Sequence, residues 1–232
     1  MREHGADVGL AFDGDADRCF VVDERGEPVS PSAVTALVAE REIARARADG
    51  ETEPVVVHNL IASRSVPETI AAAGGRAVRT RVGHSFIKGV MADERAVFGG
   101  EHSAHYYFRD FWFADTGMLA AMHVLAALGE QPGTLSGLVA RYGRYTESGE
   151  INSTVDDAAA RTAAVRARFE TDGVVADELD GLTLTKDGAD GLEWWLSVRP
   201  SNTEPLLRLN VEGADPETMA RVRDEALTVI RG

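Results

Sequence analysis

Three aspartates occupy alternate positions in one short segment near the start of the chain. The segment, here called the aspartate loop (residues 13–18), reads Asp13-Gly14-Asp15-Ala16-Asp17-Arg18 and follows an apolar run at residues 8–12. Carboxylates held this closely repel one another unless a cation lies between them, and hard divalent cations prefer oxygen ligands. The spacing predicts a Mg²⁺ site with Asp13, Asp15 and Asp17 as ligands. We expect Gly14 to relieve the steric limits on the curl of this loop.

The aspartate loop has two alternative interpretations. In a calcium-binding EF-hand, the three aspartates would fill positions one, three and five and Glu24 position twelve. However, Arg18 stands where that motif needs glycine, and the flanking residues are typical of strands rather than helices. A purely structural acidic turn is the second alternative. The pattern favours Mg²⁺ over both.

Arg18 directly follows the last of these aspartates. A guanidinium beside a divalent cation is favourable when an anion lies between them, and phosphate suits both partners. The alternative is that Arg18 only balances the neighbouring carboxylates.

A second group of polar residues lies where a predicted strand passes into a predicted helix, at residues 81–88. His84 and Lys88 are one helical turn apart, at a helix N-terminus that favours anions. Both are therefore candidate substrate-binding residues. The alternative for His84 is an ordinary surface or capping role.

Glu101, Ser103 and His105 alternate in the segment that follows Gly99-Gly100. If this segment is extended, the three side chains point to one side. A carboxylate, a hydroxyl and an imidazole together suit the hydroxyl groups of a sugar, and an imidazole can carry a proton near neutral pH. His105 is therefore also a candidate general base. The alternative is the polar face of an edge strand.

The loop Arg199-Pro200-Ser201-Asn202-Thr203-Glu204-Pro205 joins two apolar stretches near the C-terminus. Its hydroxyl and amide side chains, its backbone N–H groups and one arginine are typical of a phosphate-binding loop. We expect Arg199, Ser201, Asn202 and Thr203 to bind phosphate. A plain hairpin turn is the alternative.

The elements that position these residues follow from hydrophobic periodicity and turn residues. Up to residue 145 the pattern predicts strands at 7–12, 18–23, 54–57, 76–80 and 95–99, with helices at 31–48, 65–73, 84–92, 115–129 and 134–142. We expect Ser30 or Ser32 to cap the first helix and Asp115 the fourth. After 145 it predicts strands at 149–155, 174–177, 182–185, 192–198 and 205–211, with helices at 156–170 and 215–230. The fold class is α/β, a mixed sheet with flanking helices, followed by a smaller α+β domain.

Composition limits the classes of partner. The 232 residues carry a formal net charge of −14, which argues against nucleic acids and anionic membranes as partners. No apolar run approaches the length of about 20 residues that spans a bilayer. The single cysteine, Cys19, and the absence of an apolar N-terminal segment predict a cytoplasmic protein without an intramolecular disulfide.

Taken in order, these segments resemble the α-D-phosphohexomutases, especially bacterial phosphomannomutase/phosphoglucomutase. The aspartate loop is similar to the family's D-G-D-G-D-R metal loop, with Ala16 in place of a glycine. The segment Gly100-Glu101-His102-Ser103-Ala104-His105 is similar to its G-E-M-S-G-H sugar loop, and the 199–205 loop to its phosphate-binding loop.

The resemblance implies a division of the chain and a role for each residue. Residues 1–27 correspond to a remnant of domain 2 that carries the metal loop, 28–145 to the sugar-binding domain 3, and 146–232 to the phosphate-binding domain 4. Mg²⁺ would be the cofactor, Arg18 would assist phosphoryl transfer, and His105 would be the general base. The remaining candidates would hold a hexose phosphate: His84, Lys88, Glu101, Ser103, Arg199, Ser201, Asn202 and Thr203.

The family's reaction passes a phosphoryl group between an active-site phosphoserine and a hexose phosphate. The phosphoserine segment, typically T-A-S-H-N-P, does not occur in this chain. We therefore expect a truncated phosphohexomutase, inactive alone, whose partner is a missing N-terminal domain supplied by a longer chain. The alternatives are a non-catalytic sugar-phosphate or metal-binding protein, and a half-enzyme with a separate N-terminal partner. Phosphomannomutase is the preferred activity, because the Glu-His-Ser-Ala-His variant leans that way; mannose against glucose and the oligomeric state stay open.

Overall fold

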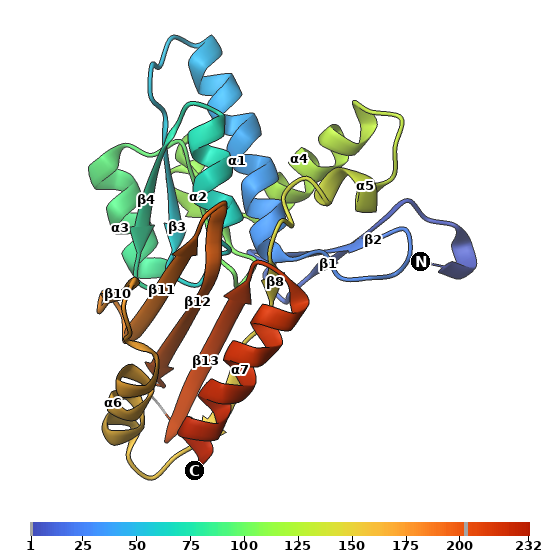
Figure 1. Ribbon diagram of the computed structural model, residues 1–232. Coiled ribbons are helices and arrows are strands. Elements are labelled where there is room, and N and C mark those ends of the chain that lie inside the picture. The colour runs from blue at the N-terminus through green and yellow to red at the C-terminus, as the bar shows by residue number, and fades with distance from the viewer. Residues whose placement is uncertain (1, 202–203) are drawn as a thin grey trace. The chain divides into compact units, whose positions relative to one another are not determined.

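A five-stranded mixed sheet forms the centre of the first of two units into which the chain divides, Met1–Arg144 and Tyr145–Gly232 (Figure 1). The computed structural model describes residues 2–201 and 204–232. Asn202 and Thr203, both predicted phosphate ligands, lie outside the described residues.

The middle part of the first unit, from α1 to β5, alternates helices and strands along the chain. Its strands are β1 (Val8–Phe12), β2 (Cys19–Asp23), β3 (Val55–Asn59), β4 (Arg76–Thr80), β5 (Phe98–Gly100), β6 (Tyr106–Phe108) and β7 (Ala114–Asp115). Its helices are α1 (Pro31–Ala48), α2 (Ser65–Ala72), α3 (His84–Glu94), α4 (Gly117–Gly129) and α5 (Leu135–Val139), with 3₁₀ turns at Arg2–His4 and Arg109–Phe111.

The five-stranded sheet has the order β4-β3-β5-β6-β7 and is covered on both faces. Strands β4, β3 and β5 are parallel, whereas β6 and β7 run antiparallel to their neighbours. Val56 of β3 packs into the core formed with α1 and α2, while Val55 and Val57 pack against Ile87 and Met91 of α3. This alternation explains why β3 begins with three consecutive valines: a strand buried on both faces needs no polar side in that stretch.

Local sequence explains where the longest helix begins. Ser30 caps α1, because its hydroxyl accepts a hydrogen bond from the Ser32 backbone N–H (3.2 Å), and Pro31 occupies the first helical position. Both features favour a helix start. The prediction of a helix at 31–48 is confirmed in both bounds.

The aspartate loop is the connection of a β-hairpin. β1 and β2 pair antiparallel as a separate two-stranded sheet, with Phe12 opposite Cys19. The buried side chains of β2, Cys19 and Val21, pack into the core shared with α1 and α4. The hairpin therefore holds the aspartate loop against the body of the first unit.

The second unit is an antiparallel sheet with two helices on one face. Its strands are β8 (Thr146–Glu147), β9 (Ile151–Thr154), β10 (Val174–Asp177), β11 (Leu182–Gly188), β12 (Gly191–Pro200) and β13 (Leu206–Gly213), and its helices are α6 (Ala158–Phe169) and α7 (Pro216–Arg231). The sheet order is β10-β11-β12-β13-β8, with β9 pairing to the other part of β13. Both helices contribute to one apolar core, α6 through Val165 and Phe169 and α7 through Val222 and Ile230.

The predicted fold class is confirmed, but one hairpin was not predicted and one predicted helix cap is wrong. The β5–β6 hairpin was missed, since the expected strand at 95–99 gave no sign of a partner at 106–108. The cap of α4 is Thr116, whose hydroxyl accepts from the Leu119 N–H (3.4 Å), rather than Asp115, which belongs to β7. Of the helices within residues 2–201 and 204–232, none combines the length and apolar character needed to cross a bilayer.

Candidate functional site

The aspartate loop brings its three carboxylates together. One oxygen from each of Asp13, Asp15 and Asp17 lies within 4.8 Å of the others. The prediction that Gly14 provides the unusual backbone of this loop is wrong: the left-handed residue is Ala16, with φ of 60°. A left-handed alanine is strained by its Cβ.

Charge in this loop is only partly balanced. Arg18 Nε donates to Asp13 Oδ2 (2.6 Å), and the Arg18 backbone N–H donates to Asp13 Oδ1 (3.2 Å). Burial acts to raise the pKa of Asp13, but these bonds and the Arg18 charge hold it below its ordinary value. Burial raises the pKa of Asp17, and the charges of Asp13 and Asp15 act in the same direction.

Asp17 also presents an oxygen without a donor. Its Oδ1 is buried, and among the described residues no group donates a hydrogen bond to it; the nearest cation there, Arg18 Nε, lies 3.9 Å away, beyond hydrogen-bond distance. A buried carboxylate oxygen without a donor is costly unless a cation meets it. The orphaned oxygen and the crowded carboxylates fit a hard divalent cation in this loop.

The segment 101–105 is a tight turn between β5 and β6, so the extended conformation considered for it does not occur. The Ala104 N–H donates to Glu101 O (3.1 Å), and the Glu101 N–H donates to His105 O (3.0 Å). Ala104 is left-handed, with φ of 67°. The predicted grouping of the three side chains still occurs, because Ser103 Oγ lies 2.9 Å and Glu101 Oε2 3.7 Å from His105 Nδ1.

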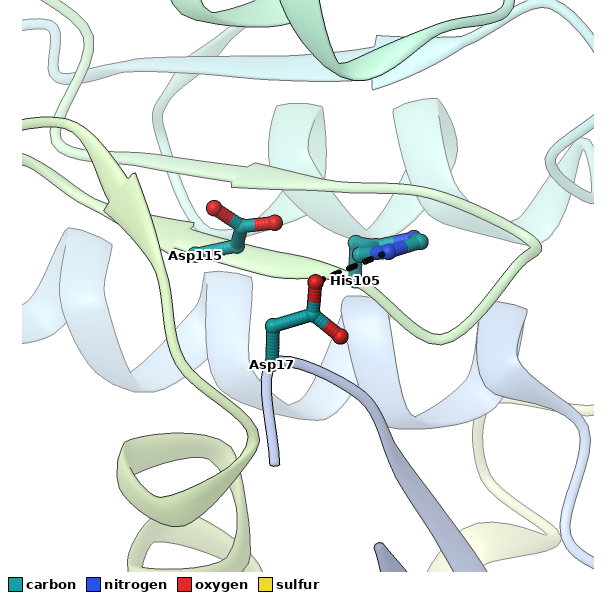
Figure 2. Close-up of side chains that lie close together, drawn as sticks. All are labelled: Asp17, His105 and Asp115. Atoms are coloured by element: carbon teal, nitrogen blue, oxygen red, sulfur yellow. Dashed lines mark ion pairs between the residues drawn. The ribbon is translucent and has the colours of Figure 1, made fainter. Parts of the chain in front are cut away.

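This 101–105 turn lies directly against the aspartate loop. His105 forms an antiparallel bridge with Arg18, and the Cys19 N–H donates to Ala104 O (3.2 Å). As a result His105 Nε2 lies 3.6 Å from Asp17 Oδ2, which Figure 2 marks with a dashed line. Two segments about 90 positions apart in the chain thus form one site.

Glu101 is the buried anchor of the turn, with 2% of its surface exposed. Its Oε2 accepts from the Tyr107 hydroxyl (2.7 Å), and its Oε1 accepts from the Gly83 N–H (3.2 Å). Burial raises the pKa of Tyr107, and the Glu101 charge adds to this effect, so the phenol stays protonated as a donor. The contact of Glu101 with a sugar hydroxyl stays a prediction.

The two candidates on α3 lie in different surroundings. Lys88 Nζ is 2.7 Å from Asp115 Oδ1 and 5.6 Å from the centre of the Tyr107 ring. His84 is the first residue of α3 and is exposed. The structure thus brings Lys88 to the cluster around His105 and leaves His84 at the surface.

Gly117 allows α4 to approach the aspartate loop closely. Its N–H donates to Ala16 O (3.1 Å), and a Cβ built on it would lie only 2.5 Å from Arg18 O. No other residue type can begin α4 this close to the loop backbone without displacing one of them.

In the second unit, Arg199 is nearly the last residue of β12 and is 8% exposed. Its Nη2 is 3.5 Å from Glu150 Oε2 and its Nη1 is 3.6 Å from Asp180 Oδ2. Burial lowers its pKa, while Asp180 and Glu150 oppose that shift. The Ser201 N–H donates to Leu206 O (2.8 Å) across the β12–β13 connection. The phosphate-binding role of this connection stays a prediction.

Sequence reasoning missed three residues of the site: Tyr107, Asp115 and Gly117. Asp115 and Gly117 act through contacts with segments distant in the chain, and Tyr107 contacts Glu101 across the β5–β6 hairpin, which was not predicted. Gly117 carried the only sequence signal, because a glycine at the start of an otherwise regular helix is costly and calls for a packing reason.

Comparison with known proteins assigns the family. The family described as “Phosphoglucomutase/phosphomannomutase, alpha/beta/alpha domain III” matches residues 30–145, and its “C-terminal domain” matches residues 150–229. The chain is 39% identical over 234 residues to the “Phosphohexose mutases” of Xanthomonas campestris pv. campestris, covering 100% of this chain and 50% of that protein. It is 39% identical over 224 residues to the phosphomannomutase of Salmonella typhimurium, covering 95% and 47%.

A solved structure supports the same assignment. The phosphoglucomutase/phosphomannomutase family protein from Burkholderia thailandensis superimposes with a TM-score of 0.80 at 26% identity, covering 97% of this chain and 47% of that one. The chain spans about half the length of the relatives it matches. It belongs to the phosphoglucomutase/phosphomannomutase family of phosphohexomutases, of which it carries domain III and the C-terminal domain.

Proposed function

We propose that this chain is the metal-binding and substrate-binding part of a phosphohexomutase. The reaction interconverts hexose 1-phosphate and hexose 6-phosphate by Mg²⁺-dependent phosphoryl transfer through a bisphosphate intermediate. One observation carries the proposal: the aspartate loop and the 101–105 turn meet, with Asp17 Oδ2 3.6 Å from His105 Nε2. The proposed metal ligands and the proposed proton acceptor therefore lie within one small site.

Asp13, Asp15 and Asp17 would hold the Mg²⁺, which when bound neutralises charge on the transferring phosphoryl oxygens. Arg18 approaches Asp13 and Asp17 through Nε. Its side-chain hydrogen bond to Asp13 comes from Nε, and its Nη groups would donate to a phosphate.

His105 would accept the proton of the attacking sugar hydroxyl. Ser103 and Glu101 lie on its Nδ1 side, which directs Nε2 toward the aspartate loop. After the bisphosphate has turned over, the same imidazole would return the proton to the departing oxygen.

The phosphoserine would come from sequence outside this chain. The relatives are about twice as long, which supports this part of the proposal. Mannose phosphates are the preferred substrates because several relatives of 36–39% identity, including those of Salmonella typhimurium and Methanocaldococcus jannaschii, are phosphomannomutases. The 199–205 loop would hold the phosphate that is not being transferred.

Metal binding tests the first step of this proposal. Mn²⁺, a spectroscopic substitute for Mg²⁺, should bind the whole chain with one equivalent in electron paramagnetic resonance titrations, and Mg²⁺ should displace it. Asp15→Asn should weaken Mn²⁺ binding at least about tenfold, since one of three charged ligands is lost. Asp7→Asn is the matched control, because Asp7 is exposed and precedes β1. Equal Mn²⁺ affinity in both variants would contradict a metal site in the aspartate loop.

A further inference from the structure

Asp17, His105 and Asp115 form a second group of potential metal ligands beside the aspartate loop. One ligand atom from each lies within 4.8 Å of the other two, and the residues come from three separate segments (Figure 2). We propose that they bind a divalent ion with affinity for imidazole, such as Zn²⁺ or Co²⁺, at a site that shares only Asp17 with the aspartate loop.

The donor types separate the two sites. The aspartate loop offers carboxylate oxygens only, which suit Mg²⁺, whereas the second cluster adds an imidazole nitrogen. Zinc sites with three protein ligands combine histidine and carboxylate in this way. Metal–ligand bonds of about 2.0–2.1 Å place tetrahedral ligands roughly 3.3 Å apart. The distance of 3.6 Å from His105 Nε2 to Asp17 Oδ2 is close to that separation.

The imidazole of His105 is oriented by neighbours on its far side. Its Nδ1 lies 2.9 Å from Ser103 Oγ and 3.7 Å from Glu101 Oε2. With the proton on Nδ1, the tautomer that these acceptors favour, the Nε2 lone pair faces Asp17. A buried carboxylate behind a histidine ligand is the usual second layer of a metal site, and it fixes both ring and tautomer. Glu101 is itself held by Tyr107 and Gly83.

Lys88 is the competing cation in this cluster. Its Nζ is 2.7 Å from Asp115 Oδ1, so it neutralises part of the charge that would attract an ion. Replacing the ammonium with an apolar side chain of similar length should therefore tighten ion binding. Substitution of a ligand should have the opposite effect and weaken it.

A bound ion would also affect the proposed reaction. This consequence rests on the proposed function: an ion on Nε2 occupies the lone pair with which His105 would take a proton. The second site would then hold the enzyme inactive until the ion left.

Titration of the whole chain with Co²⁺, followed by its visible absorption, tests the site. We expect His105→Gln and Asp115→Asn each to weaken Co²⁺ binding by about tenfold or more, while Asp15→Asn leaves it within about twofold. Lys88→Met should tighten it by up to about tenfold. Circular dichroism would confirm that each variant is folded.

A measurement on the unmodified chain removes the dependence on variants. Among its six histidines, the ring resonances of His105 should shift on addition of one equivalent of Zn²⁺ in NMR spectra. Three results would each overturn the second site. The first is that the chain binds no Co²⁺, and the second is that Co²⁺ binding is lost in Asp15→Asn but not in His105→Gln. The third is that the ring resonances of His105 do not shift on addition of Zn²⁺. Mn²⁺ titration of the same samples reports on the aspartate loop separately, so failure of one site is distinguishable from failure of the other.

Discussion

Adding one methyl group to Gly117 should damage both the stability of the first unit and metal binding. The new Cβ would lie 2.5 Å from Arg18 O, 2.7 Å from Arg18 C and 3.0 Å from Ala16 O. All three are backbone atoms, so no side-chain rotation can relieve the contact. Either the start of α4 or the aspartate loop must move.

The size of the effect follows from these contacts. Carbon and oxygen in a weak C–H···O contact are about 3.3 Å apart, so the backbones must separate by roughly 0.8 Å. Overpacking of this kind costs about 1–3 kcal/mol, and the hydrogen bond from the Gly117 N–H to Ala16 O is worth about 1 kcal/mol. We expect Gly117→Ala to lower the free energy of unfolding by about 2–4 kcal/mol. Displaced support of a metal site weakens affinity about 10–100-fold, which is the expected loss for Mn²⁺.

Urea denaturation and Mn²⁺ titration measure the two effects. Gly129→Ala is the control within the same helix, because a Cβ on Gly129 meets nothing within 4 Å. That variant should be neutral or more stable by up to about 1 kcal/mol. If Gly117→Ala matches the unmodified chain in stability and in Mn²⁺ affinity, the close approach of α4 does not position the aspartate loop.

Three further predictions concern strain, buried charge and pH. Ala16→Gly should raise the free energy of unfolding by about 0.5–1 kcal/mol, since relief of left-handed strain exceeds the added entropy of the unfolded chain; destabilisation in urea would contradict this. Glu101→Ala should lower the free energy of unfolding by about 2–3 kcal/mol, because the Tyr107 hydroxyl and the Gly83 N–H both lose their acceptor. Tyr107→Phe removes only one of these hydrogen bonds and should lower it by about 1 kcal/mol. Equal losses of the two variants in urea denaturation would contradict the anchoring role of Glu101. Burial lowers the pKa of His58 to about 4 from an ordinary value of 6.5. Between these two pH values the unfolded chain binds a proton that the folded chain does not. The free energy of unfolding therefore falls as the pH falls, by up to about 3 kcal/mol. Thermal or urea unfolding across pH 4–7 should show a flatter profile in His58→Gln, and parallel profiles would contradict neutral burial of His58.

Regular elements were predictable because local pattern and tertiary burial agree in them. Val55, Val56 and Val57 form an unbroken apolar run, and the sheet buries them on both faces as that run indicates. Ser30 and Pro31 mark the start of α1 in the sequence as they do in the structure. The aspartate loop was recognisable for a similar reason, since its ligands are adjacent in the chain.

The remaining features of the site depend on pairing between distant segments. The turn at 101–105 forms because β5 and β6 pair, yet each strand has only three residues and β5 contains two glycines. Asp115 was predicted to be a helix cap, and only the sheet places its carboxylate beside Lys88. The strained residue is Ala16 rather than Gly14, which shows that residue type alone did not identify the left-handed position.

Reconstitution of turnover tests the central proposal most directly. The half of the Xanthomonas campestris phosphohexose mutase that this chain does not cover would be joined ahead of residue 1, and conversion of mannose 1-phosphate to mannose 6-phosphate measured with Mg²⁺ and a bisphosphate activator. From the proposed function we expect no turnover by this chain alone, turnover by the joined protein, and loss of that turnover in Asp15→Asn. Turnover by the chain alone would contradict the proposal, as would a joined protein that is folded and binds Mn²⁺ yet forms no mannose 6-phosphate.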